Sequence, residues 1–278
     1  MNCGFMVKCH IGCWACYQTS QVILFIEIVK MIQIAVFSDV HGNLPALEAV
    51  LADIEKRGIQ QKFCLGDLVD FAPWGNEVVE KIRSLNIPCL MGNHDERIAF
   101  DIPVFPLSKH SEEETVARFI AIDHSKEYIT EVNKKFLSEL PFHLKLNYKV
   151  GKKHWNIQLL HAGLASNETY LYESENDEVF IHMLEESQSD IVVMGHTHLS
   201  FKKYFEAGGW AVNCGSVGRS KEENRLASYL ILTLEEEQIF PEIIQIAYPV
   251  EETIRGIEES GIPDYYAAFL KNERISVL

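Results

Sequence analysis

Short runs of apolar and β-branched residues alternate with segments in which apolar positions recur every three or four residues. The run 32–37 is nearly all apolar, as expected of a strand that is covered on both faces. Apolar residues then recur at helical spacing over 44–54, and Gly58 is a typical residue at which a helix ends. The same alternation predicts a strand over 63–65, a helix over 76–84 and a third strand over 88–91. This βαβαβ order is typical of the start of a parallel sheet in an α/β protein.

The rest of the chain continues this alternation after a polar interruption. The segment 111–140 has a helical pattern and predicts two helices, which we expect to form a cap within an insertion of about 104–140. The later pattern predicts a hairpin of strands 143–150 and 154–160, a helix over 177–187, strands over 191–194, 201–205, 210–213, 228–234 and 243–247, and helices over 251–260 and 264–271. We therefore expect residues 31–278 to form one domain with a helical cap.

The first thirty residues differ from this pattern. They hold four of the seven cysteines, Cys3, Cys9, Cys13 and Cys16, and Met31 stands directly before the first predicted strand. We expect residues 1–30 to be an extension upstream of the natural start that takes no part in the fold. The alternative is a small zinc site on Cys9, Cys13 and Cys16, with Cys3 or His10 as the fourth ligand. The other three cysteines are scattered singly, which favours a reduced, cytoplasmic protein.

Composition and charge exclude two classes of function. The chain has 278 residues, with 25 Lys and Arg against 40 Asp and Glu, which gives a net charge of −15. Such a chain has no extended basic field of the kind that grips nucleic acid. No apolar run reaches the roughly 18 residues of a membrane span. The expected partners are therefore small molecules, with no membrane and no extended nucleic acid, and the oligomeric state stays open.

Polar residues with metal-binding side chains follow five of the predicted strands. They are Asp39 and His41, Asp67, Asn93 and His94, His161, and His196 and His198. The carboxyl ends of the strands in an open α/β sheet lie along one edge, so we expect these loops to converge there. Carboxylate, amide and imidazole ligands together suit Mn²⁺, Fe or Zn²⁺ better than an all-oxygen calcium cage.

The order of these residues carries a family resemblance. The run Asp39-x-His41, Gly66-Asp67, Gly92-Asn93-His94-Asp95, His161, Gly195-His196-x-His198 resembles the signature of the calcineurin-like metallophosphoesterases, over about residues 31–250. The resemblance implies a four-layer αββα sandwich of two mixed β-sheets. It also implies two divalent metal ions, with Mn expected first and Fe, Zn, Ni or Mg as alternatives. One ion would be held by Asp39, His41, Asp67 and His198, and the other by Asp67, Asn93, His161 and His196.

Two further segments narrow the resemblance within the superfamily. Segments 66–78 and 212–218 are similar to the small prokaryotic phosphodiesterase branch that includes diadenosine tetraphosphate hydrolases. That branch usually has Pro where Cys214 stands and Pro-Arg where Ser220-Lys221 stands, so Lys221 could supply the missing positive charge. Protein Ser/Thr phosphatases of the superfamily have Arg where Phe71 stands, which makes a phosphoprotein substrate less expected.

These residues suggest a mechanism for phosphate ester hydrolysis. Two cations would lower the pKa of a bridging water, and the resulting hydroxide would attack the phosphorus in line with the leaving oxygen. His94 lies outside the implied ligand list, so we assign it to protonating the leaving group. Asp70 or Asp95 could hold the other ring nitrogen of His94, although Asp70 could equally be a solvated loop carboxylate and Asp95 a helix cap.

Contacts to the substrate are expected from the loop after the strand over 210–213. Backbone amides of this loop, with Asn213, Gly215, Ser216 and Lys221, could receive phosphate oxygens, whereas the alternative is a tight turn that leads into the next strand. The function expected is a metal-dependent phosphoesterase that acts on small phosphodiesters or dinucleotides. A broad-specificity phosphomonoesterase is the alternative enzyme, and a non-catalytic protein-binding scaffold on the same fold is the alternative outside enzymes.

Overall fold

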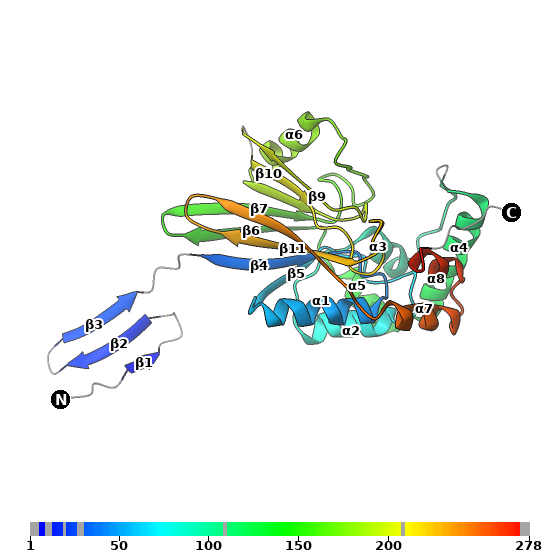
Figure 1. The fold of residues 1–278 in the computed structure, drawn as a ribbon, viewed down its shortest axis with the longest axis horizontal. Coiled ribbons are helices and arrows are strands. Elements are labelled where there is room, and N and C mark those ends of the chain that lie inside the picture. The colour runs from blue at the N-terminus through cyan, green and yellow to red at the C-terminus, as the bar shows by residue number, and fades with distance from the viewer. Residues whose placement is uncertain are drawn as a thin grey trace.

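The structure is a computed structural model that describes residues 31–107, 110–206 and 209–272, together with the backbone of three short strands nearer the N-terminus. Within these ranges the chain forms two mixed β-sheets with helices on their outer faces (Figure 1). The first sheet has the order β12-β11-β4-β5, and the second has the order β6-β7-β8-β10-β9.

The first sheet begins with the strands on either side of the first helix. β4 (Ile32–Phe37) and β5 (Gln61–Cys64) are parallel, because helix α1 (Leu44–Lys56) returns the chain to the start of the sheet. β11 (Ala227–Leu234) pairs antiparallel with β4, and β12 (Ile239–Ile246) pairs antiparallel with β11. Two segments far apart in the sequence therefore share one sheet.

The second sheet contains the hairpin and the later strands. The hairpin consists of β6 (His143–Val150) and β7 (Lys153–Leu160), and β8 (Ile191–Met194) and β10 (Gly209–Asn213) run parallel to β7. β9 (Phe201–Phe205) closes this sheet as an antiparallel edge strand. Because β7, β8 and β10 run in one direction, their carboxyl ends lie along the same edge.

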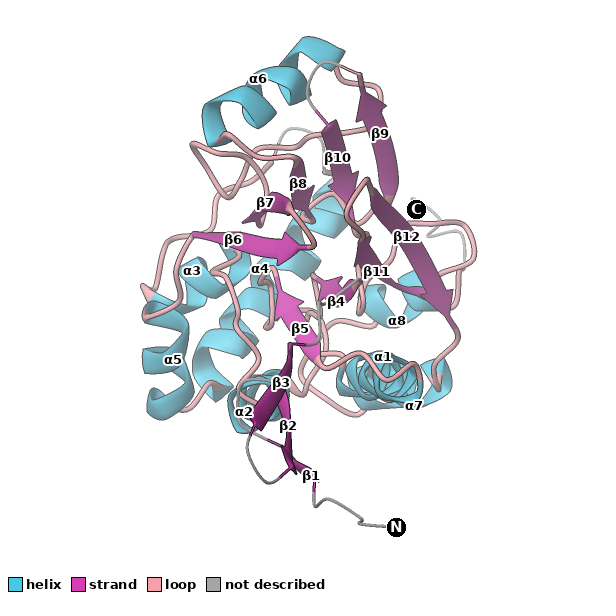
Figure 2. Ribbon diagram, turned by 90° about the vertical axis from the view of Figure 1, so that its left-hand side faces the viewer, coloured by secondary structure: helices cyan, strands magenta, loops and turns pink. Residues whose placement is uncertain are grey.

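Alternating side chains of β4 show how the layers pack. Ala35 and Phe37 pack on the same side as α1 and α2 (Gly75–Ser84), whereas Ile34 and Val36 pack against apolar residues of the second sheet such as Ile157. Helix α6 (Asp177–Ser187) covers the outer face of the second sheet, and α7 (Val250–Glu258) lies beside α1 (Figure 2). The four layers are helices, sheet, sheet and helix, which confirms the predicted αββα sandwich.

One predicted strand is wrong, and one helix was not predicted. Over 88–91 only Cys89 pairs with Cys64, as an isolated parallel bridge, because Pro88 has no N–H to donate and Gly92 ends the extended segment. Helix α3 (Asn93–Ala99) follows directly and is too short for a clear helical pattern. The last strand of the first sheet begins at Ile239 rather than at residue 243.

The predicted insertion contains the two expected helices, α4 (Glu112–Tyr128) and α5 (Glu131–Ser138). Both pack against α3, and α5 also packs against α2. The small helix α8 (Tyr265–Leu270) closes the described chain beside α7. The part of the insertion closest to the C-terminal helices is α4, whose Ala117 and Ala121 pack with Tyr266 and Ile257 in one apolar cluster.

The first thirty residues contain three short strands, β1 (Met6–Lys8), β2 (Cys13–Gln18) and β3 (Gln21–Ile26), which pair with one another as an antiparallel sheet. The side chains of the proposed zinc ligands lie outside the described residues. The expectation that residues 1–30 precede the natural start stays a prediction.

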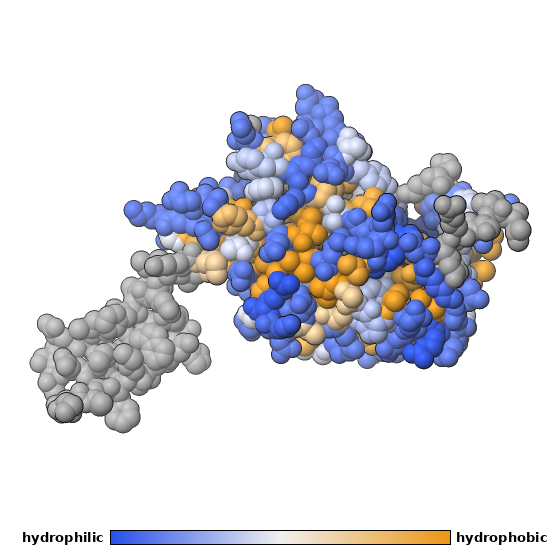
Figure 3. Space-filling model, viewed as in Figure 1, coloured by the Kyte–Doolittle hydropathy of each residue, from blue (hydrophilic) through white to orange (hydrophobic). Residues whose placement is uncertain are grey.

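Hydropathy differs between parts of the molecular surface and between the helices. Figure 3 shows hydrophilic residues over the tip of the β6–β7 hairpin and over α6, while the apolar residues on this face gather over β11 and β12. Among the helices of the described residues, none is both long and apolar enough to cross a bilayer.

Candidate active site

Five loops bring the predicted polar residues together at one edge of the two sheets. They follow β4, β5, the bridge at Cys89, β7 and β8. The metal-binding candidates are all buried, with exposed fractions between 0 and 7%, and they are Asp39, His41, Asp67, Asn93, His161, His196 and His198. Their convergence follows from the shared direction of β4, β5, β7 and β8, whose carboxyl ends meet there.

Several of these residues have an unusual backbone conformation. Asp39, His41, Asp67, His196 and His198 all have φ between 51° and 66°, in the left-handed region. This conformation is costly for residues other than glycine, and it persists only where the surroundings enforce it. Here it turns the loops sharply within four residues of the strand ends, and the side chains converge at one edge of the sheets.

A first group of potential ligands consists of Asp39, His41, Asp67 and His198. Their nearest ligand atoms all lie within 4.8 Å of one another. His198 Nε2 lies 3.2 Å from Asp39 Oδ1 and 3.1 Å from His41 Nε2, and His41 Nε2 lies 3.6 Å from Asp67 Oδ2.

A second group consists of Asp67, His161 and His196, again within 4.8 Å of one another. His161 Nε2 lies 3.4 Å from Asp67 Oδ2 and 3.1 Å from Asn93 Oδ1. Asp67 is common to both groups, and Asn93 adds an amide oxygen to the second. The two groups are those that the resemblance implied.

Backbone carbonyls hold three of the imidazole rings in one orientation. His41 Nδ1 donates to Val69 O at 3.1 Å, His161 Nδ1 donates to Leu65 O at 3.0 Å, and His198 Nδ1 donates to Arg219 O at 2.8 Å. With Nδ1 donating to a carbonyl, Nε2 of each ring faces the carboxylates. This arrangement is typical of histidines that bind a metal, because the outer hydrogen bond fixes both the tautomer and the ring orientation.

The charges in the cluster follow from burial and from Asp67. Burial by itself raises the pKa of Asp67, but the nearby imidazoles of His161 and His94 outweigh burial and hold the pKa well below its usual range. Burial lowers the pKa of His41 to about 3, and burial together with His161 lowers the pKa of His196 to about 3. Burial also disfavours charge on His161, but Asp67 outweighs it and raises the pKa of His161 to about 9. An anionic Asp67 beside the neutral imidazoles of His41 and His196 is the state that metal binding requires, whereas His161 would give up its Nε2 proton to a cation.

Glycines allow the loops to approach this closely. A Cβ atom on Gly92 would lie 2.1 Å from Asp67 Oδ1, and one on Gly195 would lie 2.5 Å from Asp39 Oδ2. Both glycines therefore leave room for a carboxylate of the cluster. Only hydrogen can occupy these positions without displacing that carboxylate.

The residues present fit divalent metal ions. Asp39 Oδ1 and His196 Nε2 are buried and have no hydrogen-bond partner among the described residues. Two unsatisfied buried acceptors beside Asp67 are costly unless a cation neutralises them. The donor set of carboxylate, imidazole and amide oxygen is the one that Mn²⁺, Fe and Zn²⁺ accept.

His94 and its neighbours lie beside this cluster. His94 Nδ1 lies 2.5 Å from Asp70 Oδ2, so of the two carboxylates considered it is Asp70 that orients the ring. Asp95 instead accepts from the backbone N–H groups of Asp67, Leu68 and Gly92, at 2.7 to 3.0 Å, and so ties the second loop to the start of α3. Burial raises the pKa of Asp70 to about 7 and lowers the pKa of His94 well below its usual range.

A pocket of about 360 Å³ opens over the two groups. Asp67, Asn93, His94, His196 and His198 line it, and so does the predicted substrate contact Lys221. The pocket wall also includes α4, through Glu114 and Arg118, whereas no residue of α5 lines it. Of the two helices of the insertion, only α4 therefore lines the pocket, whereas the apolar residues of α5 pack into the helical layer.

The other three predicted substrate contacts lie beneath the pocket wall. Asn213 donates to Gly195 O and to Thr197 Oγ1, and its own Oδ1 accepts from Gly215 N. Ser216 Oγ donates to Asp39 O at 2.8 Å and accepts from Arg219 N at 2.9 Å. These residues join the loop after β10 to the loops that carry Asp39 and His196, and their binding of substrate stays a prediction.

The pocket residues that were missed from the sequence include Arg97, Arg118, Arg219 and Tyr266. Arg219 lies over the ring of Phe71, with 4.3 Å from its guanidinium carbon to the ring centroid, and it lies 5.3 Å from the centroid of Tyr266. Arg219 follows the glycine of the loop after β10 and could have been found beside Lys221. The other three come from helices whose orientation no local pattern reveals.

Comparison with known proteins agrees with this geometry. Residues 32–200 match the family model of the calcineurin-like phosphoesterases. The chain belongs to this family. It is therefore a metal-dependent phosphoesterase, in which the Asp and His groups could bind the metal ions.

One sequence relative and two solved structures match most of the chain. The chain is 34% identical over 248 residues to the uncharacterized protein MJ0912 of Methanocaldococcus jannaschii, which covers 84% of this chain and 94% of the relative. A metallophosphoesterase from Sphaerobacter thermophilus has a TM-score of 0.66 at 24% identity, covering 86% of this chain and 98% of its own. The hypothetical protein PH1004 from Pyrococcus horikoshii has a TM-score of 0.72 at 19% identity, covering 86% and 97%. These similarities to solved structures support the fold of the phosphoesterase.

Proposed function

We propose that this phosphoesterase hydrolyses phosphodiesters of small substrates, dinucleotides among them. The observation that carries the proposal is the joint position of two ligand groups that share Asp67 and of His94, which belongs to neither group but lines the same pocket. The pocket extends to α3 and α4 on one wall and to Arg219 and Lys221 on another. A phosphodiester carries an organic group on each of two of its oxygens, so one group can contact each wall of the pocket.

The ligand groups define where the metal ions would bind. Asp39, His41, Asp67 and His198 would hold one ion, and Asp67, Asn93, His161 and His196 would hold the other. Two such ions, with manganese expected first, neutralise phosphate oxygens and make water acidic enough to act as a nucleophile at neutral pH.

His94 supplies the proton that the leaving group needs. Its Nδ1 faces Asp70, so Nε2 is the nitrogen available to a substrate in the pocket. Because burial raises the pKa of Asp70 to about 7, Asp70 can donate to Nδ1, which leaves the single proton of the neutral imidazole on Nε2. Proton transfer from Nε2 to the departing oxygen avoids a free alkoxide, and Asp70 keeps the ring in the required orientation. His94 can do this without giving up a metal ligand.

Lys221 and Arg219 bind the phosphate oxygens that face away from α3. Both line the pocket, and both follow the loop that Asn213, Gly215 and Ser216 hold in place. We therefore propose that these three residues support substrate binding by fixing the loop that carries the two cations. Arg219 is stiffened further by its contact with Phe71.

The decisive experiment compares a diester with a monoester. Protein purified without chelators is analysed for bound metal, and kcat/KM is measured for bis-p-nitrophenyl phosphate and p-nitrophenyl phosphate with Mn²⁺, Fe²⁺, Zn²⁺, Ni²⁺ or Mg²⁺. We expect the diester to be the better substrate, and activity on both to be lost in Asp67→Asn. A clear preference for the monoester would show instead that the protein is a phosphomonoesterase.

A further inference from the structure

Two buried arginines line the wall of the pocket beside His94. Arg97 lies on α3, three residues after His94 and therefore on the same face of that helix. Arg118 lies on α4, which packs against α3. Both residues line the pocket, and their exposed fractions are only 6% and 8%.

Neither guanidinium is fully neutralised by the protein. Arg97 Nη1 is buried and has no hydrogen-bond partner among the described residues, and Arg97 Nη2 donates to Glu168 Oε1 at 3.2 Å. The carboxylate of Glu168 is 64% exposed, so this ion pair is weak. Arg118 Nη1 donates to a neutral acceptor, the carbonyl oxygen of Phe105, at 3.0 Å.

The electrostatics of this wall favour an anion. Burial lowers the pKa of Arg118, and the positive charge of Arg97 lowers it further. Among the other carboxylates nearby, Asp67 faces the imidazoles of the two ligand groups, burial raises the pKa of Asp70 to about 7, and Glu114 pairs with His110 at 3.6 Å. Two buried like charges with so little compensation are costly to the folded protein, and a negatively charged ligand between them would offset that cost.

We propose that Arg97 and Arg118 form a binding site for a phosphate or carboxylate group carried by the leaving group of the substrate. The proposal rests on the proposed function, because the position of His94 defines the side from which the leaving group departs. It narrows the substrate class to phosphodiesters and phosphoanhydrides whose departing part is itself an anion, such as a nucleotide. Arginine suits this role because its planar donors can bind two oxygens at once.

The reaction that this site would serve is a simple hydrolysis. Water forms a new bond to phosphorus, and the bond from phosphorus to the leaving oxygen breaks with its electron pair on that oxygen. The leaving oxygen takes the proton from His94 Nε2, and the proton of the attacking water passes to solvent. The anion on the departing part stays bound to the two guanidiniums during this step.

The test uses two diesters that differ only in the charge of the leaving group. Methyl 4-carboxyphenyl phosphate releases a phenol that carries a carboxylate, and methyl 4-carbamoylphenyl phosphate releases the corresponding uncharged amide. The same pair of diesters with the substituent at position 3 of the ring places the charge at a second position relative to the arginines. We expect kcat/KM of the manganese-loaded wild type to be at least about tenfold higher for a carboxylate than for its amide, the ratio that one well-placed charged hydrogen bond provides. In Arg97→Met and Arg118→Met this ratio should fall toward one.

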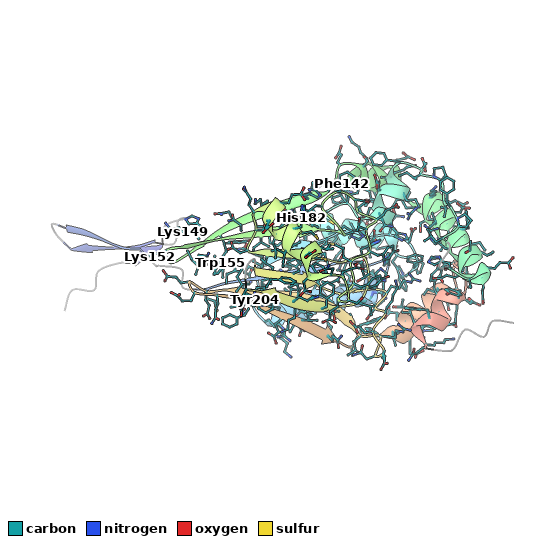
Figure 4. All side chains as sticks on the ribbon, turned by 90° about the horizontal axis from the view of Figure 1, so that it is seen from above. Phe142, Lys149, Lys152, Trp155, His182 and Tyr204 are labelled. Atoms are coloured by element: carbon teal, nitrogen blue, oxygen red, sulfur yellow. The ribbon has the colours of Figure 1, made fainter. Side chains whose placement is uncertain are left out.

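A matched variant controls for the loss of positive charge. Lys149 is exposed near the tip of the β6–β7 hairpin, at the end of the molecule away from α4 and α8 (Figure 4). Lys149→Met should keep the wild-type ratio. Calorimetry gives a second readout, in which 4-hydroxybenzoate should bind wild type and Lys149→Met more tightly than 4-hydroxybenzamide, with no such difference in the two arginine variants.

Each outcome bears on one of the two proposals. Wild-type ratios near one for both pairs of isomers would overturn the anion site while leaving the phosphodiesterase in place. The arginine variants could instead lose kcat/KM equally on the carboxylate and the amide diesters and also have a lower melting temperature. That result would show that the arginines only support the fold. If the wild type cleaved none of the four diesters or bis-p-nitrophenyl phosphate, the proposed function itself would be wrong.

Discussion

Replacing His94 with Gln tests whether this residue protonates the leaving group without binding a metal ion. The imidazole Nδ1 lies 2.5 Å from Asp70 Oδ2, and His94 belongs to neither group of potential metal ligands. Gln can keep a hydrogen bond to Asp70 but has no proton to transfer at neutral pH. His94→Gln should therefore retain the metal ions and lose only the protonation of the leaving group.

The size of the loss should depend on the leaving group. General-acid catalysis is typically worth roughly 10²- to 10⁴-fold, which corresponds to about 2.7–5.5 kcal/mol in the activation free energy. Diesters with alkyl leaving groups should lose this much in kcat/KM. With p-nitrophenolate, which departs readily as an anion, the loss should be smaller than about tenfold.

The assay is a series of methyl aryl and dialkyl phosphates with leaving groups of increasing pKa. The logarithm of kcat/KM should fall more steeply with leaving-group pKa in His94→Gln than in wild type, while metal analysis gives the same content for both. If His94→Gln lost its metal ions, or lost activity equally on every ester, His94 would not be the general acid.

Three further predictions concern the metal ligands and the stability of the fold. Asp67→Asn removes the carboxylate common to both ligand groups, so the metal content of the purified protein should fall below one ion per chain, and a protein that still held two ions would contradict the shared role of Asp67. Gly92→Ala places a Cβ 2.1 Å from Asp67 Oδ1, so it should cost about 1–3 kcal/mol in the free energy of unfolding and weaken metal binding; unchanged urea denaturation would show that the loop can move aside. Tyr229→Phe removes the hydrogen bond from the hydroxyl of Tyr229 to Asp53 Oδ2 at 2.6 Å. Burial raises the pKa of Asp53, but hydrogen bonds from Tyr229 and Arg57 outweigh burial and hold that pKa below its usual 3.8. A carboxyl with a depressed pKa stabilises the fold above that value and loses its contribution as the pH falls, so Tyr229→Phe should cost about 1 kcal/mol near neutral pH and less at about pH 3, as urea denaturation at the two pH values would show.

Much of the fold could be predicted because burial imposes a pattern on each element. The strand over 32–37 and the helix over 44–54 correspond closely to β4 and α1, since both have faces buried in the two main apolar cores. The prediction of a third strand over 88–91 was wrong because an apolar run can be buried without pairing with a neighbouring strand along its length. Local sequence shows that a segment is covered, but not which backbone is available to pair with it.

The candidate ligands could be named from the sequence because each follows a strand and carries a ligand-type side chain, in the order typical of the family. The short distances between their ligand atoms could not be predicted, because the residues lie on five loops from separate parts of the chain. Only the packing of the two sheets brings those loops within hydrogen-bond distance of one another. The choice of Asp70 rather than Asp95 as the partner of His94 was likewise settled in three dimensions, because both lie close to His94 in the loops and only one reaches its ring.

The sequence by itself determined the family, the layered α/β fold and the set of potential metal ligands, because these depend on local patterns and on residue order. The tertiary structure alone decided which helices reach the pocket. It placed Arg97, Arg118 and Tyr266 around the reaction site and left α5 outside. The physical reason is that the wall of a pocket is formed by the orientation of packed elements, and this orientation depends on contacts between residues far apart in the chain rather than on the pattern within any one segment.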